Sequence, residues 1–179
     1  FYNNFQRENK YCFIFNDSGS IVVDTMKLEY IWNFGNGEKA SGAVVSHCFP
    51  APGNYNIRLD IYERSTGKLF FAKLAYNMDL RNIEQPYINS PDVSIREDMI
   101  EFDGQKSYQP GFKILKYSWD FGDKGRSLGE KTSHSFAQRG EYIVNLELTL
   151  KSDSTGYVHK AGVSKKIVVF NDEREKYKI

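Results

Sequence analysis

Two histidines and two cysteines are the residues of this sequence best suited to nucleophilic chemistry. His47 is followed directly by Cys48, and His134 follows a serine, as His47 does. A thiolate beside an imidazole could attack a carbonyl carbon, so an enzyme with Cys12 or Cys48 as nucleophile and His47 as base is one hypothesis. Both histidines, however, fall at equivalent places of the repeat described below, and no nucleophile with an orienting partner recurs beside them. We therefore predict that the chain is not an enzyme. Both histidines are interpreted as structural, each donating to a backbone group near a following turn.

Three aspartates are the candidates for metal ligands. Asp103, Asp120 and Asp123 could gather around calcium, which prefers several oxygen ligands, but their spacing fits no twelve-residue calcium loop. The places that match Asp120 and Asp123 in the first half of the chain hold Asn33 and Asn36, which carry no charge. We expect no metal and no cofactor, and we keep the three carboxylates as calcium candidates of the second half alone.

Cys12 and Cys48 are the only cysteines, too few for a disulfide scaffold and too far apart for a paired-cysteine zinc site. In the fold that the family resemblance given below implies, they should lie on neighbouring strands, each on the face opposite the inward-pointing Phe13, Phe15, His47 and Phe49. A cross-strand disulfide is then geometrically conceivable, and two free thiols are the simpler alternative.

Exposed aromatic side chains are the candidates for glycan binding. Alternation along a strand forces one of two consecutive aromatics outward, and single exposed aromatics are common on protein surfaces. Glycan binding is therefore the alternative and not the main expectation. The aromatic candidates are Phe70, Phe71, Tyr76, Tyr108 and Tyr157, and Asn16-Asp17-Ser18 matches the N-glycosylation pattern, which occurs often by chance.

The composition excludes several function classes. Lys and Arg number 24 against 23 Asp and Glu, so the chain lacks the basic surplus that binds nucleic acid. It has no run of 18 apolar residues, so we expect no transmembrane segment. It starts at Phe1 with neither an initiator Met nor a signal-peptide pattern, and we interpret it as a piece of something longer. The 13 Phe and 12 Tyr favour strands.

An internal repeat predicts the domain organisation. The segment YIWNFGNG at 30–37 recurs 87 positions later as YSWDFGDK at 117–124. Other landmarks keep this offset without an insertion: Phe15 and Phe102, His47 and His134, Phe49 and Phe136, Gly53 and Gly140, Tyr55 and Tyr142. The sequence therefore predicts two copies of one module, residues 1–83 and 84–179, with Gln85-Pro86-Tyr87 as the joint.

Within each copy, apolar residues recur at every second position. This alternation turns one face of a strand to the core and the other to water. Short strands with turn signals about every ten residues predict an all-β fold, with one antiparallel sandwich per copy. The charged tail 172–178 is interpreted as a linker. Strands are predicted at 11–15, 26–34, 44–49, 55–62 and 69–80 in the first copy, and at 99–102, 114–121, 132–136, 142–150 and 157–170 in the second.

The Trp-Asx-Phe motif is interpreted as the end of a central strand. Trp119 and Phe121 share one face by alternation, as do Trp32 and Phe34, and each pair should fill the space between two sheets. Such burial is worth about 2–3 kcal/mol for each side chain. These four residues are the predicted core anchors.

The residues after this motif predict two turns. Gly122 and Gly35 permit a backbone angle that costs other residues energy, and Asp123 can accept hydrogen bonds from the turn's own amides. The later segments Gly53–Tyr55 and Gly140–Tyr142 are interpreted as a turn followed by an aromatic that begins the next strand, similar to a tyrosine corner.

Taken together, these motifs resemble the PKD (polycystic kidney disease) domain family, in two copies over nearly the whole chain. The resemblance implies immunoglobulin-like sandwiches of about seven strands, found outside the cytoplasm in surface proteins, secreted hydrolases and bacterial envelope proteins. Both copies depart from the usual Trp-Asp-Phe-Gly-Asp-Gly: the first has Asn33 and Asn36, and the second has Lys124 with its glycine one place later. The residues that carry the resemblance are 119–123, 134–136 and 140–142 and the strand that follows, with their partners 87 positions earlier.

The function expected from this resemblance is that of a non-catalytic spacer, adhesive and protein-interaction segment of a larger bacterial envelope or surface protein. It would lie in the periplasm, at the outer membrane or on the cell surface. Its partners would be other domains of the same polypeptide and other envelope or surface proteins. The alternative is a carbohydrate-binding accessory module of a secreted hydrolase, whose partner would be a glycan.

Overall fold

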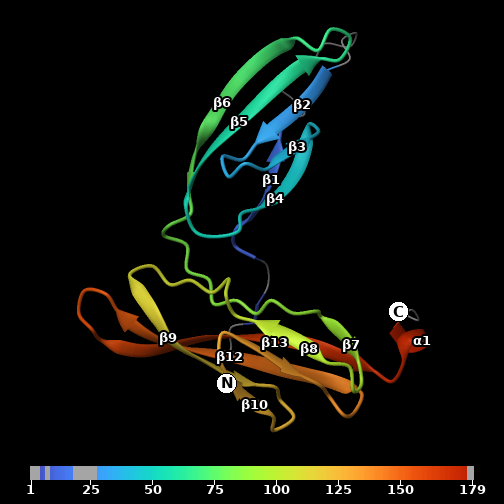
Figure 1. The fold of residues 1–179 in the computed structure, drawn as a ribbon, viewed down its shortest axis with the longest axis vertical. Coiled ribbons are helices and arrows are strands. Elements are labelled where there is room, and N and C mark those ends of the chain that lie inside the picture. Colours follow the sequence, from blue (N-terminus) through green and yellow to red (C-terminus); the bar gives the residue numbers. More distant parts are fainter. Residues whose placement is uncertain (1–4, 7–8, 18–27, 177–179) are drawn as a thin grey trace. The chain divides into compact units, whose positions relative to one another are not determined.

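The computed structural model of the chain describes residues 5–6, 9–17 and 28–176. They form two compact units, shown in Figure 1. The first module is residues 9–82, and the second module runs from Ile83 to the C-terminus and also takes in Phe5 and Gln6. Strands make up both, which confirms the predicted all-β class.

The first module consists of two antiparallel sheets. β1 pairs with β4, and the other sheet has the strand order β3-β2-β5-β6. The alternation predicted around Tyr55 appears in β5, where Ile57, Leu59 and Ile61 are all buried. The strands are β1 (Cys12–Asn16), β2 (Leu28–Asn33), β3 (Lys39–Ser41), β4 (Val44–Cys48), β5 (Asn54–Glu63) and β6 (Leu69–Asp79).

In the described part of the chain, the second module repeats this arrangement and has one further strand. β8 pairs with β11, and the larger sheet has the order β10-β9-β12-β13-β7, in which β7 is parallel to β13. Apart from β7, each strand has a counterpart about 87 positions earlier. The strands are β7 (Val93–Ile95), β8 (Ile100–Asp103), β9 (Phe112–Asp120), β10 (Arg126–Leu128), β11 (Lys131–His134), β12 (Gly140–Ser152) and β13 (Val158–Phe170).

The core of each module lies between its two sheets and is rich in aromatic rings. In the second module Phe102 of β8 contacts Trp119 of β9 and Phe121, with ring centroids 6.0 and 5.1 Å apart. In the first module Phe15 of β1 contacts Trp32 and Phe34 in the same way, at 5.5 and 5.2 Å. The predicted core anchors therefore join the two sheets of each sandwich.

The division between the modules differs from the repeat alignment at two places. Gln85 belongs to the second module and not to a joint: it is 2 % exposed, and its backbone N–H and C=O both pair with Tyr108. The alignment puts residues 5 and 6 in the first copy, yet both contact the second module, because Gln6 N–H donates to the carbonyl of Ser164 at 2.8 Å. The chain passes from the first module to the second at 82–83.

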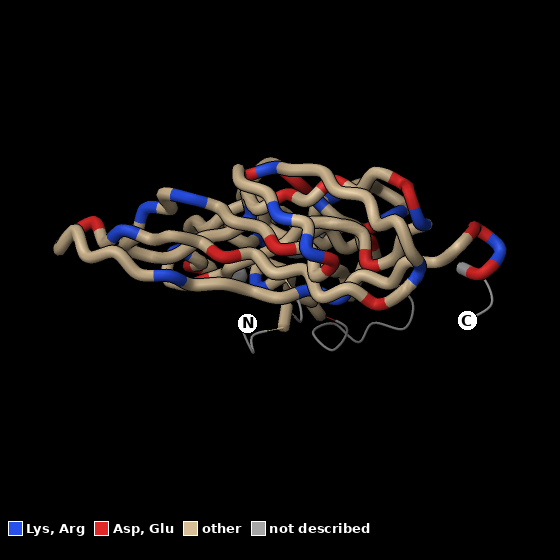
Figure 2. Tube along the Cα trace, turned by 90° about the horizontal axis from the view of Figure 1, so that it is seen from below, with Lys and Arg blue, Asp and Glu red and all other residues tan. Residues whose placement is uncertain are grey.

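Charged residues of both signs are distributed along the strands. Figure 2 shows Lys and Arg in blue and Asp and Glu in red, with both signs scattered along the trace. The charged tail predicted as a linker contains one helical turn, α1 (Glu173–Lys176). None of the helical segments in the described part of the chain is long and apolar enough to cross a membrane.

Candidate functional site

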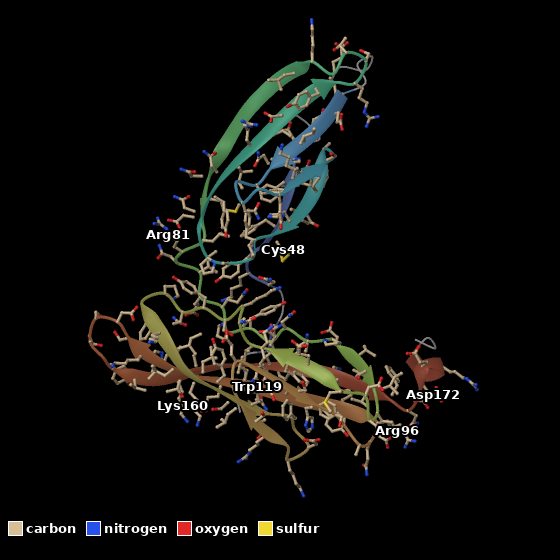
Figure 3. The ribbon with its side chains drawn as sticks, in the orientation of Figure 1. Cys48, Arg81, Arg96, Trp119, Lys160 and Asp172 are labelled. Atoms are coloured by element: carbon tan, nitrogen blue, oxygen red, sulfur yellow. A yellow bond between two sulfur atoms is a disulfide. The ribbon has the colours of Figure 1, made fainter. Side chains whose placement is uncertain are left out.

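The turn between β9 and β10 of the second module holds two of the three aspartates that were candidates for metal ligands, Asp120 and Asp123. Trp119, labelled in Figure 3, is 2 % exposed, and its indole N–H donates to the carbonyl of Gly129 at 2.8 Å. Asp120 and Asp123 each accept a backbone N–H two residues further along, from Gly122 at 3.0 Å and from Gly125 at 2.8 Å. Both carboxylates thus stabilise the turn itself.

His134 of β11 completes this turn. Its ring lies flat on Phe121, with centroids 4.0 Å apart and an interplanar angle of 2°. Its Nε2 is 2.8 Å from Asp123 Oδ2, and because a carboxylate can only accept, Nε2 donates. The prediction that His134 donates to a backbone group near the Gly-x-Tyr turn is wrong, since stacking on Phe121 directs Nε2 to the Asp123 side chain.

The His134–Asp123 pair favours the charged form of the aspartate. Partial burial by itself would raise the pKa of the Asp123 carboxyl, but the hydrogen bonds from His134 and Gly125 outweigh it and hold that pKa below its ordinary value. A carboxylate held by the imidazole it orients is common at catalytic sites, but a triad also needs a nucleophile on the other ring nitrogen. Here the ring is stacked on Phe121 and contacts Phe136.

The first module has the same turn with weaker partners. His47 stacks on Phe34 at 3.8 Å, but its Nε2 is 3.4 Å from the amide of Asn36, and its Nδ1 is 3.5 Å from Glu38. Burial lowers the pKa of His47, and Glu38 offsets part of that effect. Asn36 still accepts the backbone N–H of Glu38 at 3.1 Å, so the turn survives without the carboxylate.

The sequence did not show that two further residues, Lys124 and Gly125, shape the β9–β10 turn of the second module. Lys124 has φ 78°, the left-handed conformation that Gly37 adopts at the matching place with φ 92°. Gly125 lies against the imidazole: a Cβ there would be 2.6 Å from His134 Cε1. The first module has Glu38 at that place. The repeat did contain a signal for Gly125, because it aligns this glycine with a charged residue, Glu38, of the first copy.

Replacing Asp123 by Asn should lower the stability of the second module at neutral pH and reduce its sensitivity to acid. Because the pKa of Asp123 is depressed in the folded state, the His134 pair stabilises the module above the ordinary carboxyl value of 3.8. That stabilisation is lost as the pH falls through the lower folded-state pKa. We expect a loss of about 1 kcal/mol at neutral pH, since the pair is partly exposed. Urea unfolding from neutral to acidic pH, with hydrogen exchange resolved by module, measures it.

The control for this experiment is Asp98→Asn, which removes an exposed aspartate of the same module. It should leave both the stability and its pH dependence unchanged. If the Asp123→Asn protein lost stability with acid as steeply as the unsubstituted protein, the pair would not be the source of the effect.

The three calcium candidates are not brought together. Asp103 pairs with Lys131 at 2.8 Å, Asp120 with Arg126 at 3.3 Å, and Asp123 with His134. The described residues contain no cluster of three or more His, Cys, Asp or Glu side chains that could hold an ion. Each carboxylate is instead used in a separate local contact.

Cys12 and Cys48 form a disulfide. The sequence did not decide between this bond and two free thiols. They are directly opposite each other in the β1–β4 ladder, with Cα atoms 3.9 Å apart, and both are exposed on the face away from His47. Cys48 is labelled in Figure 3. A bonded sulfur is not a thiolate, so the structure gives the Cys-His hypothesis no nucleophile.

The tyrosine of each Gly-x-Tyr segment closes the turn before it. Tyr142 donates its hydroxyl to the carbonyl of Gln138 at 2.8 Å, and Tyr55 donates to that of Ala51 at 2.7 Å. Both bonds reach back four residues, the pattern of a tyrosine corner. Gly140 is the first residue of β12 and Gly53 directly precedes β5, the strands that the two tyrosines anchor.

The predicted glycan platform is described only in part. Tyr157 is 67 % exposed, and its ring stacks on that of His159 with centroids 6.0 Å apart, whereas Tyr108 is half-buried. The side chains of Phe70, Phe71 and Tyr76 lie outside the described residues, as does Ser18 of the glycosylation pattern.

Two sheets, antiparallel except where β7 pairs with β13, are joined in each module by a central-strand tryptophan and closed by a tyrosine corner, which defines each module as an immunoglobulin-like β-sandwich. The PKD domain family model matches residues 6–68 and 84–164, most of the chain. The chain therefore belongs to the PKD domain family and carries two copies, as the motifs indicated.

Two curated relatives are collagenases. Collagenase ColA of Clostridium perfringens is 33 % identical over 141 residues, 77 % of this chain and 12 % of that protein. A microbial collagenase of Vibrio alginolyticus is 39 % identical over 59 residues, 33 % of this chain and 7 % of that protein. The chain thus spans about an eighth or less of these relatives.

Two solved structures were also compared. The PKD1 domain of Vibrio anguillarum Epp covers 49 % of this chain and is itself covered completely, with 23 % identity and a TM-score of 0.32. The fibronectin(III)-like modules of Clostridium thermocellum CbhA cover 83 % of each chain, with 13 % identity and a TM-score of 0.30. The family assignment rests on the sequence match.

Proposed function

We propose that this chain is a non-catalytic accessory segment of a larger secreted protein of the collagenase type, in which the two modules act as a spacer and protein-interaction unit. One observation carries the proposal: a 141-residue stretch of this chain, 77 % of it, matches a collagenase, while the chain's own candidate reactive side chains are used for folding. His134 and Asp123 form a hydrogen bond at a turn, and Cys12 and Cys48 form a disulfide between two paired strands.

The local contacts support a scaffold role in preference to chemistry. The imidazoles of His134 and His47 stack on phenylalanine rings. The aspartates that were metal candidates pair with Lys131, Arg126 and His134. A module whose candidate reactive side chains are held in its own contacts suits a segment that separates other domains.

The alternative is carbohydrate binding, and one observation favours it. Tyr157 presents an exposed ring, stacked on His159, directly before the first residue of β13. An exposed flat ring is the surface on which a sugar can stack, but one such ring provides little area for affinity. We therefore place this function second.

A single preparation of the 179-residue protein tests both functions. It is incubated with gelatin and with soluble and insoluble polysaccharides, and product release and co-sedimentation are measured for the unsubstituted protein and for Tyr157→Ala. The accessory role predicts no hydrolysis and no sedimentation with polysaccharide for either protein. Hydrolysis that is lost on His134→Ala would contradict the non-catalytic proposal. Sedimentation with polysaccharide that Tyr157→Ala abolishes would establish the carbohydrate-binding alternative in its place.

A further inference from the structure

The second module has an incomplete sheet edge where its first strand changes sheets. Asn89 pairs with Asp103 of β8, so the chain there belongs to the smaller sheet. It then crosses to the larger sheet, where Val93 to Ile95 form β7 along Val168–Phe170 of β13. β7 does not extend along the earlier part of β13, around Ser164. There the edge of β13 can pair with another segment.

Among the described residues, no other strand pairs with the backbone of Ile88 after this crossover. Successive peptide groups of a strand point to opposite sides, so those of Asn89 face β8 and those of Ile88 face away from it. Ile88 is 0 % exposed, and a buried N–H and C=O without partners are costly. We call the region between Ile88 and the Ser164 edge of β13 the crossover cleft.

Phe5 and Gln6 lie in the crossover cleft and bond to both of its sides, to Ser164 on one side and to Ile88 on the other. Phe5 forms a parallel bridge with Ser164, the same direction in which β7 runs along β13, and Gln6 N–H donates to the Ser164 carbonyl at 2.8 Å. The carboxamide of Gln6 then makes two bonds to one residue: Ile88 N–H donates to its Oε1 at 2.6 Å, and its Nε2 donates to the Ile88 carbonyl at 3.0 Å. A primary carboxamide thus replaces the peptide group of a missing strand.

The rest of the cleft is held open by a charged contact. Lys165, whose side chain is 12 % exposed, donates to the carbonyl of Ser90 and pairs with Asp92 at 2.9 Å. A hollow of about 590 Å³, lined by Phe5 and Gln6 together with Tyr87, Ser90 and Lys165, continues toward β7. The site is therefore built from both sheets of the module.

We propose that the crossover cleft is a peptide-acceptor site for an extended segment with a carboxamide side chain, and that its occupant is Phe5 and Gln6 of this same chain. Gln6 is its anchor. The second module is then completed by residues that precede the first module, and the first module is inserted between two parts of the second. The proposal does not depend on the accessory function proposed above.

Three variants of the 179-residue protein test the anchor: Gln6→Ala, Gln6→Glu, and the control Gln138→Ala, which removes an exposed glutamine side chain of the same module. Amide exchange of Ile88 is measured by NMR. We expect it to rise about tenfold or more in Gln6→Ala, since a buried N–H loses its acceptor. In the nearly isosteric Gln6→Glu, the carboxylate opposes the Ile88 carbonyl, so exchange should rise at least as much. Gln138→Ala should leave it unchanged.

Two outcomes would overturn the proposal. Ile88 exchange that is equal in Gln6→Ala and in the control would mean that the carboxamide anchors nothing. In the unsubstituted protein, absence of contacts between the Phe5 and Ser164 backbones in the NOE spectrum would remove the occupant directly, whatever the variants do. Sedimentation over a wide range of concentration completes the test. A dimer that Gln6→Ala abolishes would show that the segment comes from a second copy and would overturn the intramolecular assignment, and a monomer supports it.

Discussion

Trp119→Ala should unfold the second module and leave the first module folded. The indole is 2 % exposed, contacts Phe102 and donates to Gly129, so its removal leaves a large cavity and an unmet carbonyl at the centre of the sandwich. Such truncations cost about 3–5 kcal/mol, a large part of the stability of a domain of this size. The released Phe5 and Gln6 belong to no sheet of the first module.

The measurement uses the tryptophan that remains. In Trp119→Ala the only tryptophan is Trp32, so its fluorescence follows the first module alone while circular dichroism follows both. The matched control is Trp32→Ala, which removes the indole that donates to Gly42 at 3.1 Å and should have the reciprocal effect. A simultaneous loss of both modules in either variant would mean that the chain unfolds as one cooperative domain.

Gly122→Ala should be the most damaging single-methyl substitution of the second module's turn. Gly122 has φ 82°, and a Cβ there would be 2.8 Å from the backbone oxygen of Ile143. The left-handed conformation costs an alanine about 1 kcal/mol, and the contact with a fixed backbone atom should add about 1–3 kcal/mol. We expect a total of about 2–4 kcal/mol, measured as a shift in the urea midpoint of the second module.

Gly111→Ala separates the two causes. Gly111 has a similar φ of 75°, but nothing lies within 4 Å of its Cβ position. This control should therefore lose only the conformational part, about 1 kcal/mol. If the two substitutions cost the same, the close approach to Ile143 would contribute nothing and the turn would be less tightly packed than described.

Much of the fold could be predicted from the sequence because its signals are local. The alternation in β5 and β12 depends only on which face each residue shares, and the structure has Val144, Leu146 and Leu148 buried as expected. The positions of Trp119 and Phe121 in the core follow from the same rule. The constant offset then transfers each element from one copy to the other.

The sequence predicted which residues form the candidate site, but it did not predict which bonds they make. The repeat marked His134 and Asp123 as structural positions, but the partner of His134 depends on how its ring lies on Phe121, which no spacing specifies. Gly125 was missed because its role appears only when the imidazole is next to it. The pairing of Cys12 with Cys48 likewise needed the β1–β4 register.

The sequence by itself determined that this chain is two copies of one β-sandwich, since periodicity and a fixed offset need no knowledge of distant contacts. Only the tertiary structure decided where Phe5 and Gln6 belong. The repeat aligns Gln6 with Val93, the first residue of β7. By this alignment, Gln6 would belong to an edge strand of the first copy. In the structure its carboxamide bonds to Ile88, 82 positions away. The physical reason is that buried peptide groups at a sheet edge must be satisfied by whichever segment can reach them, and reach is a property of the folded chain.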